Sequence, residues 1–349
     1  MKSLQNSNSK ININNFDLLR FLFAGTVCLV HTCELSGYKE LYILKTFLSS
    51  GVAVKSFFVL SGFLIFMSYE RSESKKSYIK KRVRRIYPAY FTSIVMFAVF
   101  LALLSTNTAE KYFSTDWIKY VFANLTFLNF LQHTLPGVFE TNKLPVVNGA
   151  LWTLKIEVMF YMTVPFFVFL FRKFGHLKTI MFFYCISVTY SISCSYMMER
   201  TGFDLYSILG RQLPGQLSYF LGGGFFYYNL HFFKKYNHYF FLVATLFLIL
   251  HVFHPLPYLE PFALASLVVF LGFFYYMGKF GKYGDFSYGI YITHFPIIQI
   301  ILELGWFKDS PWLYLTTVVM FTLISAVIMW HFVEKRFLSK DSHYIRSKN

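Results

Sequence analysis

The sequence predicts an all-α, polytopic membrane protein with about ten transmembrane helices and both termini in the cytoplasm. Composition is the first observation behind this class, because 56% of the residues are hydrophobic and only 14% are charged, whereas a soluble domain carries about 25% charged residues. The second is the recurrence of apolar runs of about 18 residues. The third is the distribution of lysine and arginine, which alternates between the segments that join these runs.

Ten candidate spans follow one another, and each is expected to form a helix. They are residues 16–32, 51–69, 87–105, 151–171, 179–198, 215–231, 239–254, 259–277, 287–304 and 312–333. Residues 1–15 are polar and asparagine-rich, and no small-residue cleavage site follows the first apolar run, so we expect the first span to remain in the mature protein. The expected organisation is a polar cytoplasmic segment at 1–15, a transmembrane domain at 16–337 and a cytoplasmic tail at 338–349.

The distribution of lysine and arginine predicts how the chain is oriented in the membrane. With ten spans, 22 of the 33 lysines and arginines fall on the side of the N-terminus and eight on the opposite side. The richer side is cytoplasmic by the positive-inside rule. We therefore interpret the net charge of +16 as a topology signal. It does not indicate nucleic-acid binding, because the basic residues are spread over short loops and match no nucleic-acid module.

The four cysteines do not indicate a metal site. The spacing of a zinc site, C-x-x-C or Cys/His, is lacking at Cys28, Cys33, Cys185 and Cys194. They are therefore interpreted as small packing residues, and no metal site is predicted.

The loop at residues 106–150 is on the predicted outer side. Loops of this length in compact proteins are functional or disordered, and this one is the expected docking place for an extracytoplasmic substrate.

Arg20 and His31 are ionisable residues within the first span. They are eleven positions apart, which at 100° per residue places both on one face of a helix, about 16 Å apart along its axis. Taken singly, Arg20 could reach the cytoplasmic headgroups beside Asp17, and His31 could be an interfacial residue beside Glu34. Together on one face, they favour a polar passage.

Three more clusters contain candidate site residues. In "SYIKKRVRRIYPAYF", Arg82 and Arg85 share a cationic helix face that suits phosphate, although a positive-inside signal explains the same charges; Pro88 is expected to close this segment and start the third span. In "NGALWTLKIEVMFYM", Glu157 and Tyr161 share a face of the fourth span, near Trp152. In "GDFSYGIYITHFPII", Tyr291 and His294 share a face of the ninth span.

Six motifs, in order, give the chain a family resemblance. They are the arginine, ten residues, histidine pattern at Arg20 and His31, "FFVLSGFLI" at 57–65, the Arg-x-x-Arg pair before "IYP", "LWTLKIEVMFY" at 151–161, "SYGIYITHFPI" at 287–297 and "FVEKRF" at 332–337. With these motifs the chain resembles the acyltransferase 3 family of integral membrane enzymes, which O-acetylate surface polysaccharides. The resemblance covers residues 16–337.

The resemblance implies a membrane O-acetyltransferase of the bacterial inner or cytoplasmic membrane. Its acetyl donor is cytoplasmic acetyl-CoA, its acceptor a hydroxyl of a surface glycan or lipid-linked oligosaccharide, such as O-antigen, capsule or exopolysaccharide, and it needs no tightly bound cofactor. Carried over by motif, His31 is the catalytic histidine, Arg20 lines the passage, and Arg82 with Arg85 binds CoA phosphates. We add Glu157 as a second catalytic candidate, with Trp152, Tyr161, Tyr291 and His294 as substrate-binding candidates. Whether His31 acts as a base or accepts the acyl group stays open.

Two points qualify this interpretation. Many family members have an acid two positions before "FFVLSG", where this chain has Lys55, so another group, with Glu34 and Glu157 as candidates, is expected to replace it. The alternative function is a transporter or exporter of a lipid-linked glycan. The absence of Gly/Pro-interrupted spans in matched halves argues against an inverted-repeat transporter.

Overall fold

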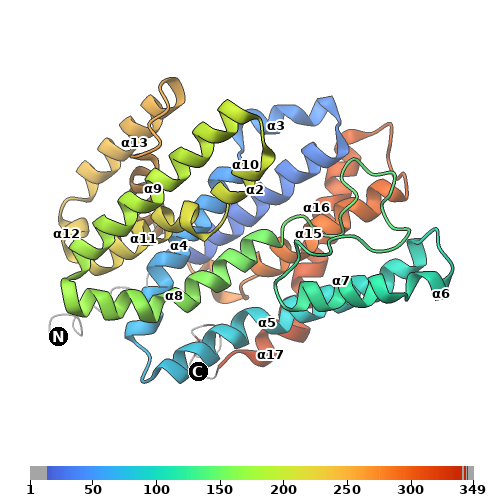
Figure 1. Cartoon of the computed structure of the whole chain (residues 1–349), viewed down its shortest axis with the longest axis horizontal. Coiled ribbons are helices and arrows are strands. Elements are labelled where there is room, and N and C mark those ends of the chain that lie inside the picture. The colour runs from blue at the N-terminus through green and yellow to red at the C-terminus, as the bar shows by residue number, and fades with distance from the viewer. Residues whose placement is uncertain (1–13, 275, 340–341, 343, 345–349) are drawn as a thin grey trace. The chain divides into compact units, whose positions relative to one another are not determined.

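The computed structural model describes residues 14–274, 276–339, 342 and 344, and in this part of the chain all regular structure is helical (Figure 1). The predicted all-α class is therefore confirmed. Most of the predicted N-terminal segment 1–15 and of the tail 338–349 lies outside the described residues.

The chain divides into two compact units. The first unit comprises residues up to Leu19, Val54–Ile79 and Ile156–Phe280, and the second comprises Arg20–Ala53, Lys80–Lys155 and the residues from Gly281 onward. Four long helices contribute residues to both units: α2 (Phe16–Ser36), α4 (Ser50–Glu70), α5 (Lys75–Phe100) and α8 (Trp152–Phe174).

The first unit is built around α11. Its own helices are α9 (His176–Thr201), α10 (Asp204–Gly210), α11 (Leu213–Tyr228), α12 (Leu230–Lys235), α13 (Asn237–Phe253) and α14 (Glu260–Phe273). Helix α11 packs against α9 and α14, and α13 packs against α14. The glycine run of α11 allows a close approach to α4, because a Cβ at Gly223 would overlap the carbonyl group of Val59.

The second unit is built around α15 (Ser287–Glu303), which runs beside α16 (Pro311–Met329), orange to red in Figure 1. Its shorter elements are η2 (Lys39–Leu41), α3 (Tyr42–Phe47), η3 (Leu101–Leu104), α6 (Ala109–Tyr112), α7 (Thr115–Leu125), η5 (Trp330–Glu334) and α17 (Lys335–Phe337), with η4 (Phe280–Lys282) at the boundary between the units. Helix α15 is rich in apolar residues, and most of its side chains are buried.

Six helical segments of the described residues are long and apolar enough to cross a membrane: Phe16–Ser36, Lys39–Glu70, Lys75–Leu104, Trp152–Phe174, His176–Thr201 and Pro311–Phe337. They coincide with six of the ten predicted spans. The other four predicted spans are also helical, as α11, α13, α14 and α15, but have only 14 to 17 residues. At 1.5 Å per residue, helices of about 14 to 17 residues are shorter than a hydrocarbon core of about 30 Å. By length, therefore, six of the ten predicted spans are long enough to cross a membrane.

Helix α5 differs from the prediction at Pro88. We expected Pro88 to close the basic segment and start a new span, but one helix begins at Lys75 and runs through Pro88. Prolines are tolerated inside membrane helices, where neighbouring groups satisfy the freed backbone atoms. The consequence is that Arg82 and Arg85 lie on the same rigid helix as the third span.

The long loop between the third and fourth spans is tied to α15. The buried side chain of Gln299 donates a hydrogen bond to the carbonyl group of Val146 at 2.9 Å. Asn148 donates to the carbonyl group of Ile292 at 2.9 Å, and Lys143 donates to the carbonyl group of Glu34 at 2.8 Å. The second half of the loop therefore lies against α15 and the end of α2 that carries His31.

Candidate active site

Helix α2 carries the two residues that the sequence analysis placed on one face. It is continuous from Phe16 to Ser36, so Arg20 and His31 are presented by the same rigid element. Arg20 is partly exposed and His31 is half-buried. The predicted separation of about 16 Å along the axis follows from this unbroken helix.

His31 contacts a second histidine. Its Nδ1 lies 2.9 Å from Nε2 of His294 on α15. The centroids of the two rings are 5.2 Å apart and their planes are inclined at 23°, and the ring of Phe295 meets His31 edge-on at 5.7 Å. His294 is fully buried, and its Nδ1 lies 3.1 Å from the carbonyl oxygen of Ile290 in the preceding turn.

Tyr291 lies on the same side of α15 as His294. Their ring centroids are 5.9 Å apart, and the hydroxyl group of Tyr291 lies 2.6 Å from the hydroxyl group of Thr153, at the start of α8. Thr153 donates a hydrogen bond to the carbonyl group of Ala150, so Tyr291 is the donor to Thr153. The half-buried Trp152 is the first residue of α8 and immediately precedes Thr153.

Arg20 and Arg85 meet at a buried carboxylate. Asp285 is 1% exposed at its side chain and accepts hydrogen bonds from Arg20 at 3.2 Å and from Arg85. Arg85 also donates to Glu334, whose side chain is 0% exposed, at 3.1 Å. Tyr344 donates to Asp285 at 3.1 Å and accepts from Arg20 at 3.2 Å. The two guanidinium charges are thus balanced by two carboxylates inside the protein.

The local structure explains how these acids are placed. Asp285 precedes α15, and its second carboxylate oxygen accepts hydrogen bonds from the backbone N–H and the hydroxyl group of Ser287, which begins the helix. Glu334 ends the π-helical stretch η5. Such stretches are frequent at functional sites.

Three residues of this cluster were not predicted from the sequence: Asp285, Glu334 and Tyr344. The first two stand in the quoted segments "GDFSY" and "FVEKRF", but a single acid at the end of an apolar run gives no sign of its partner. The arginines Arg20 and Arg85 could have indicated these acids, since charges buried near a membrane need counter-charges. Arg82 is partly buried on the same helix as Arg85.

Glu157 and Tyr161 are also hydrogen-bonded to each other. Both belong to the first unit. Tyr161 donates a hydrogen bond to Glu157, and Ser61 of α4 donates to the same carboxylate oxygen at 3.1 Å. The predicted face that Glu157 and Tyr161 share on α8 therefore holds a carboxylate between two hydroxyl groups.

Lys55, at the position where the family resemblance implies an acid, is ion-paired. Its Nζ lies 2.7 Å from Glu260 at the start of α14, and 5.2 Å from the ring centroid of Tyr219. Glu34, one of the acids considered as a replacement, pairs with Lys45 at 3.3 Å. The group in contact with Nδ1 of His31 is His294.

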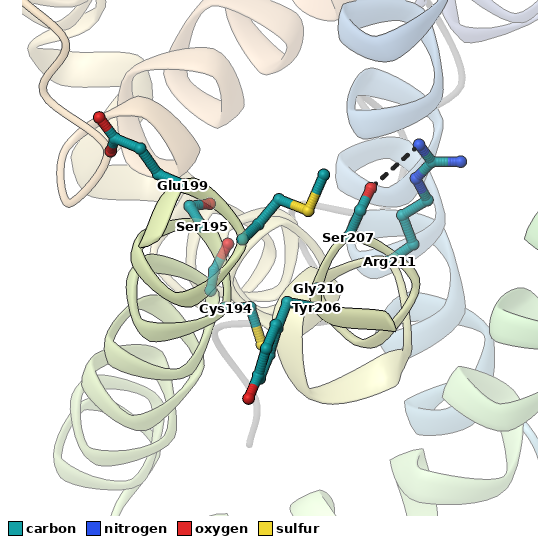
Figure 2. A pocket seen from close by; sticks show the side chains of 9 residues that line it. Cys194, Ser195, Glu199, Tyr206, Ser207, Gly210 and Arg211 are labelled. Atoms are coloured by element: carbon teal, nitrogen blue, oxygen red, sulfur yellow. Dashed lines mark hydrogen bonds between the residues drawn. The ribbon is translucent and has the colours of Figure 1, made fainter. Parts of the chain in front are cut away.

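The first unit also contains a hollow of about 370 Å³. Figure 2 shows it between the last turns of α9 and helix α10, with Ser195, Glu199, Tyr206 and Arg211 on its walls and a hydrogen bond of 3.2 Å from Arg211 to Ser207. None of the predicted site residues lines it. Among the described residues, no three His, Cys, Asp or Glu side chains form a cluster that could hold a metal ion.

The fold and the site together define a class: a multi-helical membrane protein with a histidine pair and a charge-balanced arginine cluster in one unit. Comparison with known families assigns that class. Residues 13–331 match the model of the acyltransferase 3 family, described as an acyltransferase domain. The chain belongs to this family, and the predicted resemblance is confirmed.

Individual relatives agree with the family. The chain is 28% identical to an O-acetyl transferase of Shigella phage Sf6 over 356 residues, which cover 94% of this chain and 97% of the phage protein. It is 32% identical to nodulation protein 10 of Rhizobium leguminosarum bv. viciae over 186 residues, 48% of this chain and 47% of that protein. No solved structure matches the chain significantly. Membership makes the protein an acyltransferase, and the likeness to the phage protein supports O-acetyl transfer in particular.

Proposed function

We propose that the protein transfers an acetyl group from cytoplasmic acetyl-CoA to a sugar hydroxyl of a bacterial surface glycan, such as O-antigen, capsule or exopolysaccharide. The observation that carries this proposal is the unbroken helix α2, which joins Arg20 in the arginine cluster to His31. Family membership supports acyl transfer, and the name of the phage relative supports acetyl as the acyl group and oxygen as the acceptor atom.

The proposed topology follows the charge count. We infer that α11, α13, α14 and α15 cross the membrane as well, which gives ten spans with both termini in the cytoplasm. Their shortness is compatible with crossing, because a bilayer can thin locally around short helices. In this orientation the arginine cluster is near the cytoplasmic side and His31 is near the outer side. The protein would then lie in the bacterial cytoplasmic membrane.

The donor end uses the cationic groups of α2 and α5. Guanidinium groups bind phosphate oxygens in pairs, so Arg82 and Arg85 are assigned to the phosphates of CoA and Arg20 to the entrance of the passage. Because Asp285 and Glu334 hold Arg85 in place, its geometry is fixed before CoA arrives. The extended arm of acetyl-CoA would then run along α2 towards His31.

The chemical step takes place at His31. A sugar hydroxyl is a poor nucleophile near neutral pH, and an imidazole, whose ordinary pKa is about 6.5, can accept its proton. In the direct mechanism the hydroxyl oxygen attacks the thioester carbon, the hydroxyl proton passes to Nε2 of His31, the C–S bond breaks, and the CoA thiolate leaves and takes up a proton. In the covalent mechanism an imidazole nitrogen of His31 attacks the thioester carbon, and the C–S bond breaks to release the CoA thiolate. The sugar hydroxyl oxygen then attacks the acetyl carbon of acetyl-histidine, the N–C bond breaks, and the hydroxyl proton passes by way of the freed imidazole to the thiolate.

Four further predicted residues are given roles in this proposal. Trp152 and Tyr291 are assigned to the acceptor sugar, since aromatic rings stack on apolar sugar faces and hydroxyl groups bind sugar hydroxyls. Glu157, with Tyr161, is proposed as a second acid–base group. The loop at residues 106–150, anchored to α15, would cover the acceptor.

One experiment tests the proposal directly. Purified protein in detergent is incubated with acetyl-labelled acetyl-CoA and with surface glycan from a strain that lacks the gene, and acetylation is followed by mass spectrometry. We expect label in an ester on the glycan. A folded protein that binds acetyl-CoA but transfers no acetyl group to any surface glycan of its own strain would contradict the proposal.

A further inference from the structure

We infer that His294 is a positioning residue that fixes the tautomer of His31, so that Nε2 of His31 carries the reactive lone pair. The inference rests on the proposed function, because it assigns the nitrogen that acts in acyl transfer. It replaces the expectation that His294 binds substrate, since the side chain is fully buried and faces His31.

The hydrogen-bond chain begins at a group whose role is fixed. The carbonyl oxygen of Ile290 can only accept a hydrogen bond, so Nδ1 of His294, 3.1 Å away, is the donor and carries a proton. A neutral imidazole has one N–H, and this assignment makes Nε2 of His294 an acceptor. The described neighbours of the buried ring, Tyr291, Phe295 and the Ile290 carbonyl group, carry no negative charge that would compensate an imidazolium ion.

The same donor and acceptor assignment determines the protonation of His31. Its Nδ1 lies 2.9 Å from the accepting Nε2 of His294 and is therefore the donor. The proton of neutral His31 is then on Nδ1, and the lone pair is on Nε2. In the part of the chain that the structure describes, no protein group hydrogen-bonds this Nε2, so it is available to a sugar hydroxyl or to a thioester carbon.

Both mechanisms left open above use this arrangement. As a base, Nε2 takes the sugar proton, and the resulting imidazolium ion keeps its Nδ1–H bond to His294. As a nucleophile, Nε2 attacks the thioester carbon and the C–S bond breaks to release the CoA thiolate, while the Nδ1–H bond to His294 is kept. When the sugar oxygen takes the acetyl group, the N–C bond breaks and Nε2 accepts the hydroxyl proton. A second histidine thus takes the orienting position that a carboxylate occupies in a Ser-His-Asp triad.

The surroundings hold His294 firmly enough for this role. Helix α15 approaches α16 closely, because a Cβ at Gly289 would lie 2.8 Å from Cα of Ala326. Asn148 fixes the backbone at Ile292, and Thr153 holds Tyr291 beside the His294 ring. Catalytic groups work best when their supporting residues are locked in this way.

The test combines a spectroscopic measurement with kinetics. The full-length protein, labelled isotopically at histidine, is studied by nitrogen NMR, which distinguishes the two tautomers, and the His31 signal is assigned by its loss in His31→Asn. We expect the Nδ1–H tautomer for His31 in the native protein. An Nε2–H tautomer there would overturn the inference, even if acetyl transfer were normal.

Two substitutions at His294 supply the second part. His294→Leu removes the acceptor, so we expect a mixture of tautomers at His31 and a turnover number about 10-fold to 100-fold lower, the range for loss of a group that orients a functional histidine, with little change in the KM for acetyl-CoA. His294→Gln keeps an accepting oxygen near the position of Nε2, and we expect it to recover most of the lost turnover. His254→Gln makes the same chemical change at an exposed histidine and serves as the control.

The outcomes separate the two proposals. Equal turnover in His294→Leu and the native protein, with the tautomer unchanged, would overturn the inference but leave the proposed function intact. If the native protein has the expected tautomer but transfers no acetyl group, the proposed function fails while the assigned hydrogen bond stands. The NMR measurement on the native protein also remains decisive if His294→Leu does not fold.

Discussion

Arg85 on α5 and Asp285 ahead of α15 form an ion pair across 200 positions of sequence, and the aspartate side chain is 1% exposed. Arg20 donates to the same carboxylate oxygen at 3.2 Å. Asp285 therefore joins three segments of the second unit. They are the part of α2 that begins at Arg20, helix α5, and the residues just before α15. Its first role is to hold the cationic end of the site together.

This gives a prediction for stability. Asp285→Asn keeps the shape of the side chain but leaves two guanidinium groups without their shared counter-charge. We expect it to lower the free energy of unfolding by about 3 to 5 kcal/mol, the range for removing one partner of a buried ion pair, as measured by thermal unfolding in detergent. Asp309→Asn, at an exposed aspartate, is the matched control. Equal melting temperatures for the two variants would show that Asp285 does not have this role.

Binding of acetyl-CoA provides the second prediction. Arg82→Ala combined with Arg85→Ala should weaken acetyl-CoA binding by about 10-fold to 100-fold, since each charge-assisted contact contributes on the order of 1.5 to 3 kcal/mol and the carboxylates compensate part of the charge. The affinity, measured by equilibrium binding, should also fall with rising salt. Arg84→Ala removes an exposed arginine of the same helix, and we expect it to have a smaller effect. Unchanged affinity in the folded double variant would leave the cluster as a topology signal.

The sequence predicts interactions within one helix better than those between helices. Arg20 and His31 could be placed on one face because a helix converts spacing into direction. His294 was noted from its spacing to Tyr291, but its contact with His31 joins positions 263 apart, and no local pattern specifies such a pair. The same holds for Asp285 and Glu334. The four short helices were correctly expected to be helical, but their lengths depend on packing that a hydropathy pattern does not record.

The ion pair at Lys55 supports a third prediction. Lys55 and Glu260 lie 2.7 Å apart with side chains 31% and 14% exposed, so Lys55→Glu places two carboxylates in contact. We expect a loss of stability on the order of 1 to 3 kcal/mol, below the range of about 3 to 5 kcal/mol for fully buried pairs because this one is partly exposed. The charge-swapped double variant, Lys55→Glu with Glu260→Lys, should recover most of the melting temperature. If it is no more stable than the single variant, the pair does not explain how the chain tolerates a lysine here.

Topology is the fourth prediction. By the charge count, Lys76 is cytoplasmic and Lys143 is outside. Both side chains are exposed, so cysteine at either position can be tested with a membrane-impermeant maleimide in intact cells. We expect labelling of Lys143→Cys but not of Lys76→Cys until the membrane is opened. The reverse pattern would invert the orientation and with it the assignment of donor and acceptor sides.

The fifth prediction concerns His31, on which the proposed chemistry depends most. His31→Ala should insert and fold, because removing a polar group from a span does not raise the insertion cost, yet acetylation of the glycan should fall by at least about 100-fold, as expected for loss of a general base or nucleophile. His31→Gln is the steric control, since it keeps a hydrogen-bonding group of similar size that cannot accept a proton at neutral pH. Label from acetyl-CoA supplied without acceptor separates the two mechanisms, because only the covalent one leaves acetyl on His31 of the native protein. If His31→Gln retains most of the native acetylation, His31 is neither base nor nucleophile, and the shared face of Arg20 and His31 must be a polar packing surface.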